Sequence, residues 1–353
     1  MQFSPLHIQQ DVPLCSLTTL GVGGRARFFL RAESEDEVAS AVHFAQARGL
    51  TLLVVGGGSN LVISDRGWPG LVLQIGILGI DPRRSGEEPG FEVGAGVAWD
   101  SFVAHGVSLG YGGVECLSGI PGSVGGTPVQ NVGAYGQEVS ETILSVLVFD
   151  RAEERVRRLT AAECNFRYRQ SVFNSEAQGR YIILRVHYRL RPNAAPSLLY
   201  ADLQRYFGAP SRTPTLGEAR QRVLEIRAAK GMLVRPDDPD SRSVGSFFKN
   251  PVLSPAAFES LRAEARRRNL AVPNYPALAQ QKKVSAAWLV ENSGLPKGYT
   301  RGHVGLSTKH ALAIVNRGGA TADEVLALKE EMQRAVEETW GIHLDPEPVL
   351  VGF

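Results

Sequence analysis

The stretch GIPGSVGGTPVQNVGAYG, residues 119–136, contains six glycines among its eighteen residues, and almost none of its side chains suits a packed core. Glycine permits positive φ and close approach of the backbone, and successive N–H groups form concavities that hold anions such as phosphate. Gln130 and Asn131 add two amide side chains able to read a polar ring edge. A second glycine-rich turn, VVGGGSN at 54–60, lies upstream. Two such loops predict a large phosphate-bearing cofactor rather than an irregular surface loop.

The composition describes a globular protein of two or three domains without a nucleic-acid footprint. Its 353 residues are 43% hydrophobic and 21% charged, and the net charge of +2 is spread without blocks. The three cysteines and the histidines show no metal-ligand spacing, so we expect no metal and reduced thiols. The N-terminus has neither a basic start nor an apolar run, and no stretch approaches the ~20 apolar residues of a membrane span. We therefore expect a cytoplasmic protein without membrane insertion, and no obligate protein partner is evident.

The first part of the chain alternates predicted strands with a helix. Ser34 to Glu37 has the residue types of a capping box, and the apolar stripe that follows predicts a helix ending at Gly49. Strands are expected before it, at 26–30, and after it, at 51–55. The order is an α/β signal, but Leu61 stands where a Rossmann fingerprint has its third glycine, so the nucleotide is bound in another way.

From residue 71 to about 190, short β-rich runs alternate with glycine turns around one helical stretch at 99–109, which predicts an α+β cofactor domain. The composition becomes loop-like near residue 191, and a helix-rich part follows. Its helices are expected at 216–230, 255–269, 285–293 and 321–340, the last opening with a second capping box at Thr321 to Glu324.

The segment GSFFKNP, residues 245–251, places a serine hydroxyl beside two phenylalanines, with a lysine and an asparagine nearby. A helix cap or turn would explain this serine equally well. The chain has no GxSxG elbow, so a serine hydrolase is not favoured. A hydroxyl in such a site suits proton donation by general acid catalysis.

Ordered motifs along almost the whole chain resemble those of the UDP-N-acetylenolpyruvoylglucosamine reductases, flavoenzymes also called UDP-N-acetylmuramate dehydrogenases. The motifs are TTLGVGG (18–24), VVGGGSNLVISD (54–65), GIPGSVGGTPVQNVGAYGQE (119–138), FRYRQSVF (166–173), GSFFKNP (245–251), AAWLVENSGLPKG (286–298), KHALAIVN (309–316) and PEPVLVG (346–352). The resemblance implies an α+β fold with an FAD-binding domain of the vanillyl-alcohol-oxidase type in two α/β subdomains, residues 18–191. It also implies a C-terminal α+β substrate-binding domain, residues 192–353, whose last strand carries Glu347 back towards the flavin.

The resemblance assigns roles to single residues. Arg169, Ser246 and Glu347 match the catalytic arginine, the proton donor and the catalytic glutamate. The positions implied to bind the flavin are Gly56, Gly57, Gly58, Ser59, Asn60, Pro121, Gly125, Gly126, Thr127, Gln130, Asn131, Gly133, Ala134 and Tyr135. Those implied to bind substrate are Tyr168, Tyr200, Lys230, Lys249, Asn250, Lys297 and His310. Tyr200 resembles the tyrosine that closes over the substrate diphosphate in the longer class of these enzymes.

For several of these residues a structural role is the alternative. Arg169 could form a surface ion pair, Glu347 could be solvated, Tyr200 could be a half-buried strand residue, and His310 could be a packed histidine.

The implied activity uses noncovalent FAD and NADPH to reduce the enolpyruvyl ether of UDP-N-acetylglucosamine-enolpyruvate to UDP-N-acetylmuramate, in peptidoglycan synthesis. An FAD-dependent oxidase of the same fold, acting on an alcohol or lactone, is the alternative. Such oxidases often tether flavin through a histidine in the glycine turn, and GGGSN has none. A flavin- or nucleotide-binding module without catalysis would not need Arg169, Ser246 and Glu347 together.

Two features depart from the family pattern. Pro348 follows Glu347, which leaves the orientation of that glutamate open. An insertion, MLVRPDDPDSRS at 232–243, precedes GSFFKNP and is expected to be a solvated loop.

Overall fold

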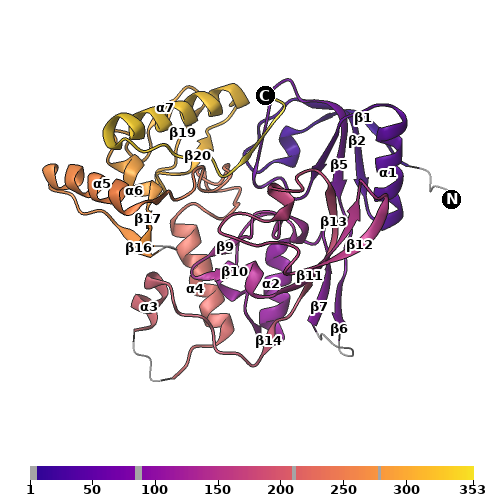
Figure 1. The fold of residues 1–353 in the computed structure, drawn as a ribbon, viewed down its shortest axis with the longest axis horizontal. Helices are drawn as coiled ribbons and strands as arrows, with labels where there is room; N and C mark the ends of the chain where they lie inside the picture. Colours follow the sequence, from indigo (N-terminus) through magenta and orange to yellow (C-terminus); the bar gives the residue numbers. More distant parts are fainter. Residues whose placement is uncertain (1–5, 84–89, 209–211, 277–279) are drawn as a thin grey trace. The chain divides into compact units, whose positions relative to one another are not determined.

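The computed structural model describes residues 6–83, 90–208, 212–276 and 280–353 (Figure 1). By its internal packing the chain divides into two compact units. Unit 1 consists of Met1–Val12, Arg25–Gly58 and Trp68–Ala229, and unit 2 of Pro13–Gly24, Ser59–Gly67 and Lys230–Phe353. The N-terminal part of the chain therefore contributes two short segments to unit 2. The boundary predicted at residue 191, between an FAD-binding and a substrate-binding domain, stays a prediction. The two packing units have different boundaries.

One sheet of unit 1 is built on parallel pairing. Its order is β1 (Gln9–Pro13), β2 (Arg25–Ala32), β5 (Trp68–Ile75) and β3 (Leu52–Val55), and both β2 and β3 pair parallel with β5. The chain passes from β2 to β3 through α1 (Glu35–Ala47), which lies alongside this sheet in Figure 1. The predicted strands and helix of this region are confirmed.

The start of α1 differs in detail from the expected capping box. The Ser34 hydroxyl accepts a hydrogen bond from the Glu37 N–H at 3.2 Å, as an N-cap should. The Glu37 carboxylate, however, accepts from the N–H of Glu33 at 2.6 Å instead of returning to Ser34. The N-cap was predicted correctly, but the reciprocal half of the box is displaced by one residue.

The second sheet of unit 1 is antiparallel. Its order is β12 (Arg155–Thr160), β11 (Ile143–Asp150), β13 (Tyr181–Tyr188), β7 (Gly90–Gly94) and β6 (Ile80–Arg83). The predicted helix at 99–109 is α2 (Trp99–Ser108). Buried residues from both sheets, α1 and α2 form one hydrophobic cluster, in which the Phe102 and Tyr188 ring centroids lie 4.9 Å apart. The two sheets are thus halves of one packed body.

Short elements and two further helices make up the rest of the described residues of unit 1. The strands are β8 (Tyr111–Gly112), β9 (Gly133–Ala134), β10 (Gln137–Glu138) and β14 (Arg191–Pro192), and the helices are α3 (Ala201–Phe207) and α4 (Leu216–Ala229). Single 3₁₀ turns are η2 (Glu115–Leu117), η3 (Val124–Gly126), η4 (Val139–Glu141) and η5 (Val172–Asn174), while η1 (Cys15–Leu17) belongs to unit 2. The helix predicted from residue 216 is confirmed as α4.

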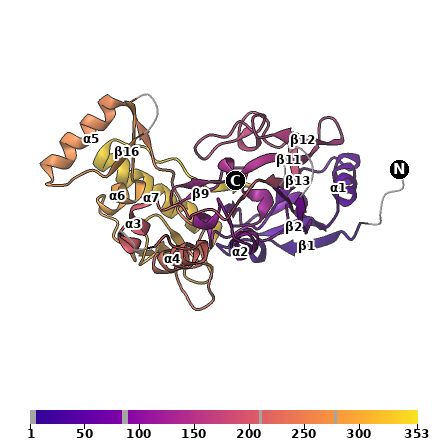
Figure 2. The same cartoon turned by 90° about the horizontal axis from the view of Figure 1, so that it is seen from below.

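The described residues of unit 2 form three small sheets and three α-helices besides η1. The sheets are β15 (Val252–Leu253)–β17 (Lys282–Val284)–β16 (Asn274–Pro276), β18 (Thr300–Arg301)–β19 (Val304–Leu306)–β20 (Ile314–Asn316), and the parallel pair β4 (Leu61–Ile63)–β21 (Val349–Val351). The helices are α5 (Pro255–Arg267), α6 (Ala286–Glu291) and α7 (Ala322–Trp340), and Figure 2 shows α5 beside β16. Thr321 and Glu324 form the reciprocal capping box predicted for α7.

The insertion at 232–243 is only partly the solvated loop that was expected. Val234 and its neighbours to residue 237 are exposed, but Asp240 is only 1% exposed, and Ser241 and Ser243 are also buried. The Asp240 carboxylate accepts hydrogen bonds from the Ser307 and Thr308 hydroxyls and from Arg317. The prediction was wrong for this half of the insertion, because a buried carboxylate with several donors is stable where an unpaired one is not.

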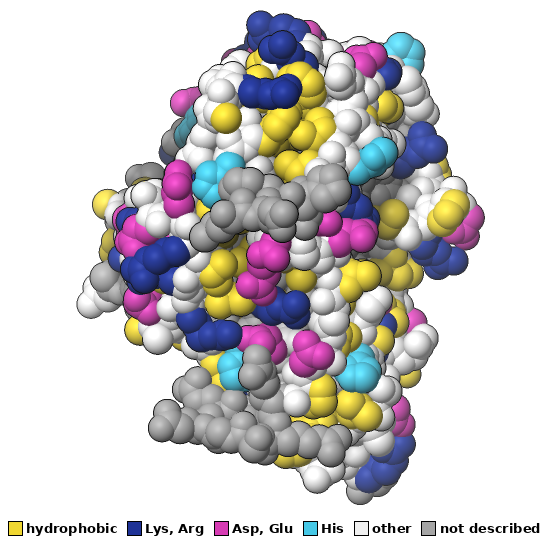
Figure 3. All heavy atoms as spheres, turned by 90° about the vertical axis from the view of Figure 1, so that its right-hand side faces the viewer, with side chains coloured by type: hydrophobic (Ala, Val, Ile, Leu, Met, Phe, Trp, Pro, Cys, Tyr) yellow, Lys and Arg dark blue, Asp and Glu magenta, His cyan; other side chains and the backbone are white. Residues whose placement is uncertain are grey.

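The surface agrees with the dispersed charge of the sequence. On the face shown in Figure 3, lysine and arginine side chains lie interspersed with aspartate and glutamate. One such pair in unit 1 joins Arg157 to Glu163 at 3.2 Å. Within the described ranges, no helix has both the length and the apolar character needed to cross a bilayer.

Candidate active site

The first glycine turn packs against the second within unit 1. A Cβ atom on Gly57 would lie 2.6 Å from Gly122 Cα, and one on Gly56 would lie 2.6 Å from Ser123 Oγ. Gly58 has φ +65°, in the left-handed region that favours glycine. Gly57 is therefore needed for the close approach of the two backbone segments, and Gly56 for the close approach of the Ser123 side chain.

Ser123 provides a test of whether these loops fit a phosphate group. Its hydroxyl is buried and finds no hydrogen-bond partner among the residues that the structure describes. A buried hydroxyl without a partner is costly unless a ligand supplies one. The next residues form η3, and the Cβ position of Gly126 faces open space within 4 Å. An unpaired donor beside a glycine cradle fits a phosphate-bearing cofactor such as FAD, which Ser123 and the loop backbone would hold.

Two of the side chains implied to bind the flavin are engaged within the protein. The Asn131 amide donates to Glu138 Oε2 at 2.8 Å and to the Arg167 carbonyl at 3.1 Å. The Thr127 hydroxyl lies 2.7 Å from the Tyr188 hydroxyl. These bonds stabilise the shape of the 119–136 loop, so contacts from these two side chains to the flavin stay a prediction.

Arg169 lies against the same loop. It has φ +55°, and its guanidinium donates to the Gly133 carbonyl at 2.8 Å while lying 5.3 Å from the centre of the Tyr168 ring. The Asn174 side chain donates to the Arg169 carbonyl at 3.2 Å and fixes this backbone conformation. Asn174 was not singled out from the sequence, although it closes the capping box of η5 with Ser171.

Tyr200 is the residue before helix α3 and not a strand residue. Its ring meets that of Tyr135 edge-on, with centroids 4.9 Å apart and an interplanar angle of 89°. Unit 1 therefore places the tyrosine implied to bind the substrate against one implied to bind the flavin.

Unit 2 brings together Ser246 and Glu347. Phe247 and Phe248 are fully buried and fix the GSFFKNP segment in the core. The Phe247 carbonyl accepts from the Glu347 N–H at 2.9 Å. The Glu347 carbonyl in turn accepts from the Asn60 side chain at 3.3 Å. Main-chain pairing thus brings positions that are distant in the sequence to one place.

The serine hydroxyl lies beside a histidine, and the charges of two lysines act on that histidine. Ser246 Oγ lies 3.1 Å from His310 Nε2. Burial, followed by the positive charges of Lys230 and Lys297, lowers the pKa of His310 to about 4, so its ring is neutral at pH 7. The ring adds no charge at pH 7, and Lys230 and Lys297 supply positive charge near it that suits an anionic ligand.

The remaining substrate-binding candidates in unit 2 have mixed surroundings. Asn250 Oδ1 accepts from the Ala286 N–H at 2.9 Å and so takes part in the start of α6. The Lys249 N–H donates to the Asp345 carbonyl at 2.9 Å, and Lys297 pairs with Glu291 at 2.9 Å.

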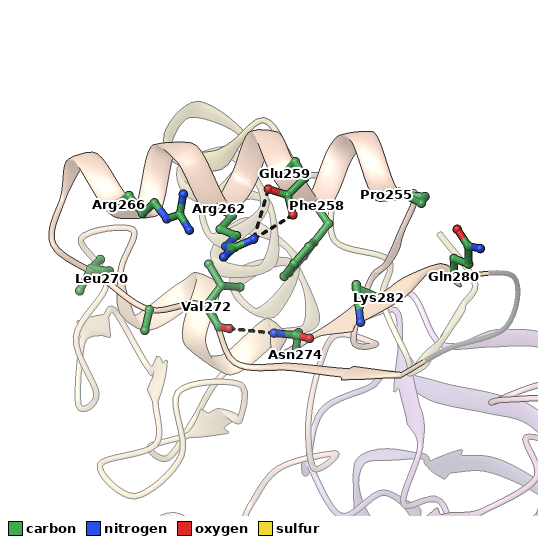
Figure 4. A pocket seen from close by; sticks show the side chains of 11 residues that line it. Pro255, Phe258, Glu259, Arg262, Arg266, Leu270, Val272, Asn274, Gln280 and Lys282 are labelled. Atoms are coloured by element: carbon green, nitrogen blue, oxygen red, sulfur yellow. Dashed lines mark hydrogen bonds and ion pairs between the residues drawn. The ribbon is translucent and has the colours of Figure 1, made fainter.

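A pocket of about 600 Å³ lies elsewhere in unit 2, between α5 and the β16–β17 strands (Figure 4). Phe258 and Val272 form an apolar part of its wall, and Arg262 and Lys282 are on its polar side. None of the residues predicted to bind flavin or substrate lines this pocket, so it is not the predicted active site.

Comparison with known proteins finds a separate family model for each of two parts of the chain. Residues 26–160 match the family model "FAD binding domain", and residues 237–351 match "UDP-N-acetylenolpyruvoylglucosamine reductase, C-terminal domain". With the glycine cradle and the serine site, these matches define a flavin-dependent oxidoreductase of α+β fold.

Full-length relatives specify the family. The chain is 46% identical to the UDP-N-acetylenolpyruvoylglucosamine reductase of Thermobifida fusca, over 97% of this chain and 98% of the relative. It is 42% identical to the Mycobacterium tuberculosis protein of that name, over 99% and 97%. The solved structure of the Thermus caldophilus reductase matches with a TM-score of 0.67 and 26% identity, covering 99% of this chain and all of that one. The chain belongs to the UDP-N-acetylenolpyruvoylglucosamine reductase family, whose members use FAD and NADPH.

Proposed function

We propose that Ser246, Arg169 and Glu347 carry the chemistry by which this family member reduces the enolpyruvyl ether of its UDP-sugar to a lactyl ether. The glycine loops and Ser123 would hold FAD, which would supply hydride transfer from NADPH to the vinyl CH2 carbon of the substrate. Negative charge then develops on the neighbouring carbon and its carboxylate. Because the chain belongs to the reductase family, a reductase describes it better than the FAD-dependent oxidase considered as the alternative.

Ser246 donates the proton in this proposal. Its O–H bond breaks as a C–H bond forms at the carbon next to the substrate carboxylate. The observation that carries the assignment is the half-buried hydroxyl 3.1 Å from His310 Nε2, a ring that burial keeps neutral at pH 7.

Arg169 and Glu347 stabilise the developing enolate. The guanidinium of Arg169 is held by the Gly133 carbonyl, so little rotational freedom remains to be lost when it meets a carboxylate. Glu347 has its backbone fixed by Phe247 and Asn60, which supports a defined position in spite of the proline that follows it.

Binding of the UDP-sugar is assigned to the remaining candidates. Lys230 and Lys297 supply positive charge near His310 for the diphosphate or carboxylate. Tyr200 supplies a hydroxyl from the start of α3, and residues 192–353 form the substrate-binding part in this proposal. A reaction that consumes NADPH and a UDP-sugar belongs in the cytoplasm and needs no protein partner.

The test separates the two half-reactions of Ser246→Ala by stopped-flow absorbance. Reduction by NADPH should proceed at nearly the parent rate, because no proton reaches the substrate carbon in that step. Oxidation by the enolpyruvyl substrate should slow by ~10²-fold or more, with little change in substrate affinity. An unaffected second half-reaction would assign the proton to another group, and equal slowing of both halves would indicate a disturbed flavin site.

A further inference from the structure

His310 is placed with its ring against the serine hydroxyl by a fixed turn. The Ser307 hydroxyl accepts from the N–H groups of Lys309 and His310 at 3.0 and 3.2 Å. The same hydroxyl donates to the buried Asp240 carboxylate at 3.0 Å. A network that begins in the insertion therefore sets the backbone from which the His310 side chain reaches Ser246.

The hydrogen bond between Ser246 and His310 has two possible directions. If Nε2 is bare, it accepts the serine proton and directs that proton away from any substrate. If Nε2 carries hydrogen, it donates to Oγ, and the serine proton is free to point elsewhere. Because the ring is neutral, it carries one proton, and only one of the two tautomers leaves Ser246 able to act as an acid.

We propose that His310 is a positioning residue that donates its Nε2–H to Ser246 Oγ and so directs the serine proton towards the substrate carbon. This inference rests on the role proposed for Ser246. It gives His310 a function in proton transfer, distinct from a contact to the UDP-sugar.

The proton balance is simple. As the Ser246 O–H bond breaks and the C–H bond forms, the oxygen becomes an alkoxide that accepts a hydrogen bond from Nε2 of His310. The imidazole keeps its proton throughout. Water reprotonates Ser246 after the product leaves.

The test compares His310→Ala, His310→Gln and the exposed control His343→Ala as FAD-loaded full-length proteins. The Ala variant should slow the substrate half-reaction by roughly 10- to 100-fold, because it removes a hydrogen bond to a developing charge. Reduction by NADPH and the affinity for UDP-N-acetylmuramate, measured by titration of flavin absorbance, should change by less than about threefold. Gln retains an N–H donor and should recover most of the lost rate. His343→Ala should match the parent.

A double-mutant comparison separates this inference from the proposal on which it rests. If His310 acts through Ser246, the protein lacking both side chains should be no slower than Ser246→Ala alone. Additive losses would overturn the positioning role, as would a Gln variant no faster than Ala or a loss confined to substrate affinity. If Ser246→Ala itself reacts at the parent rate, the proton-donor proposal fails first. Retained flavin content and thermal unfolding temperature confirm that each variant is folded.

Discussion

Replacing Asp240 by asparagine substitutes an NH2 group for one oxygen of a buried carboxylate. The two oxygens of that carboxylate accept hydrogen bonds from different partners. Oδ2 accepts from the Ser307 hydroxyl at 3.0 Å and from the N–H and hydroxyl of Thr308 at 2.9 and 2.6 Å. Oδ1 accepts from Arg317 Nη1 at 2.7 Å. An amide has only one oxygen, so in either orientation its NH2 group faces a donor.

The expected cost follows from this mismatch. A hydrogen bond to a charged group contributes about 1.5–3 kcal/mol, and breaking a buried ion pair costs about 3–5 kcal/mol. Arg317 is 23% exposed and also donates to the Leu306 carbonyl at 2.9 Å, so it keeps part of its solvation and one partner. We therefore predict that Asp240→Asn lowers the free energy of unfolding of unit 2 by roughly 2–4 kcal/mol at pH 7.

The pH dependence gives the same prediction a second test. Burial raises the pKa of Asp240, but hydrogen bonds from Thr308, Ser307 and Arg317 outweigh burial and hold the pKa below its ordinary value. A lowered folded-state pKa means that the stabilisation is complete above the unfolded-state pKa and is lost as the pH falls through the folded one. The difference between parent and variant should thus be constant near neutrality and shrink below about pH 4.

Hydrogen exchange in increasing urea, followed by mass spectrometry, resolves the two units. Amides of β19 and β20 should open at lower urea in the variant, while those of β11 in unit 1 stay unchanged. Glu264→Gln, which removes a surface carboxylate from its pairs with Arg267 and Arg268, is the matched control and should have a much smaller effect. If the β19 and β20 amides of the variant exchange at the same urea concentration as those of the parent, the reasoning is refuted.

Two further predictions concern the glycine loops and the thiols. Gly57→Ala should reduce the amount of bound flavin, because its Cβ would lie 2.6 Å from a backbone atom of the facing loop. The ratio of flavin to protein absorbance measures this loss. The control Gly217→Ala, at an unstrained helical position, should keep the parent's flavin content. Burial raises the pKa of Cys164 to about 12 and also raises that of Cys116, so a disulfide reagent at pH 8 should label only the half-buried Cys15 until denaturant is added. Labelling of all three thiols in the folded protein would contradict that burial.

Local signals in the sequence predicted much of the fold. Helix α7 was located by Thr321 and its apolar stripe, because a cap and a 3.6-residue period are properties of neighbouring residues. The glycine loops were recognised because close backbone approach requires that residue type. What local signals could not supply were pairings across the chain: 64 residues separate Ser246 from His310, and an aspartate that becomes buried looks the same in sequence as its exposed neighbours.

Residues 59–67 belong to unit 2, although most of that unit is formed by residues after 229. This has a consequence for synthesis on the ribosome. β4 pairs with β21 at the far end of the chain, and 287 residues separate Asn60 from its acceptor Glu347. At 5–20 residues per second, β4 waits roughly 15–60 s for its partner strand. Unit 2 therefore closes only after β21 has been synthesised, and any fragment that stops before β21 leaves β4 without its partner strand. A stop codon before β21 should be as damaging to folding as a lesion in the first glycine turn.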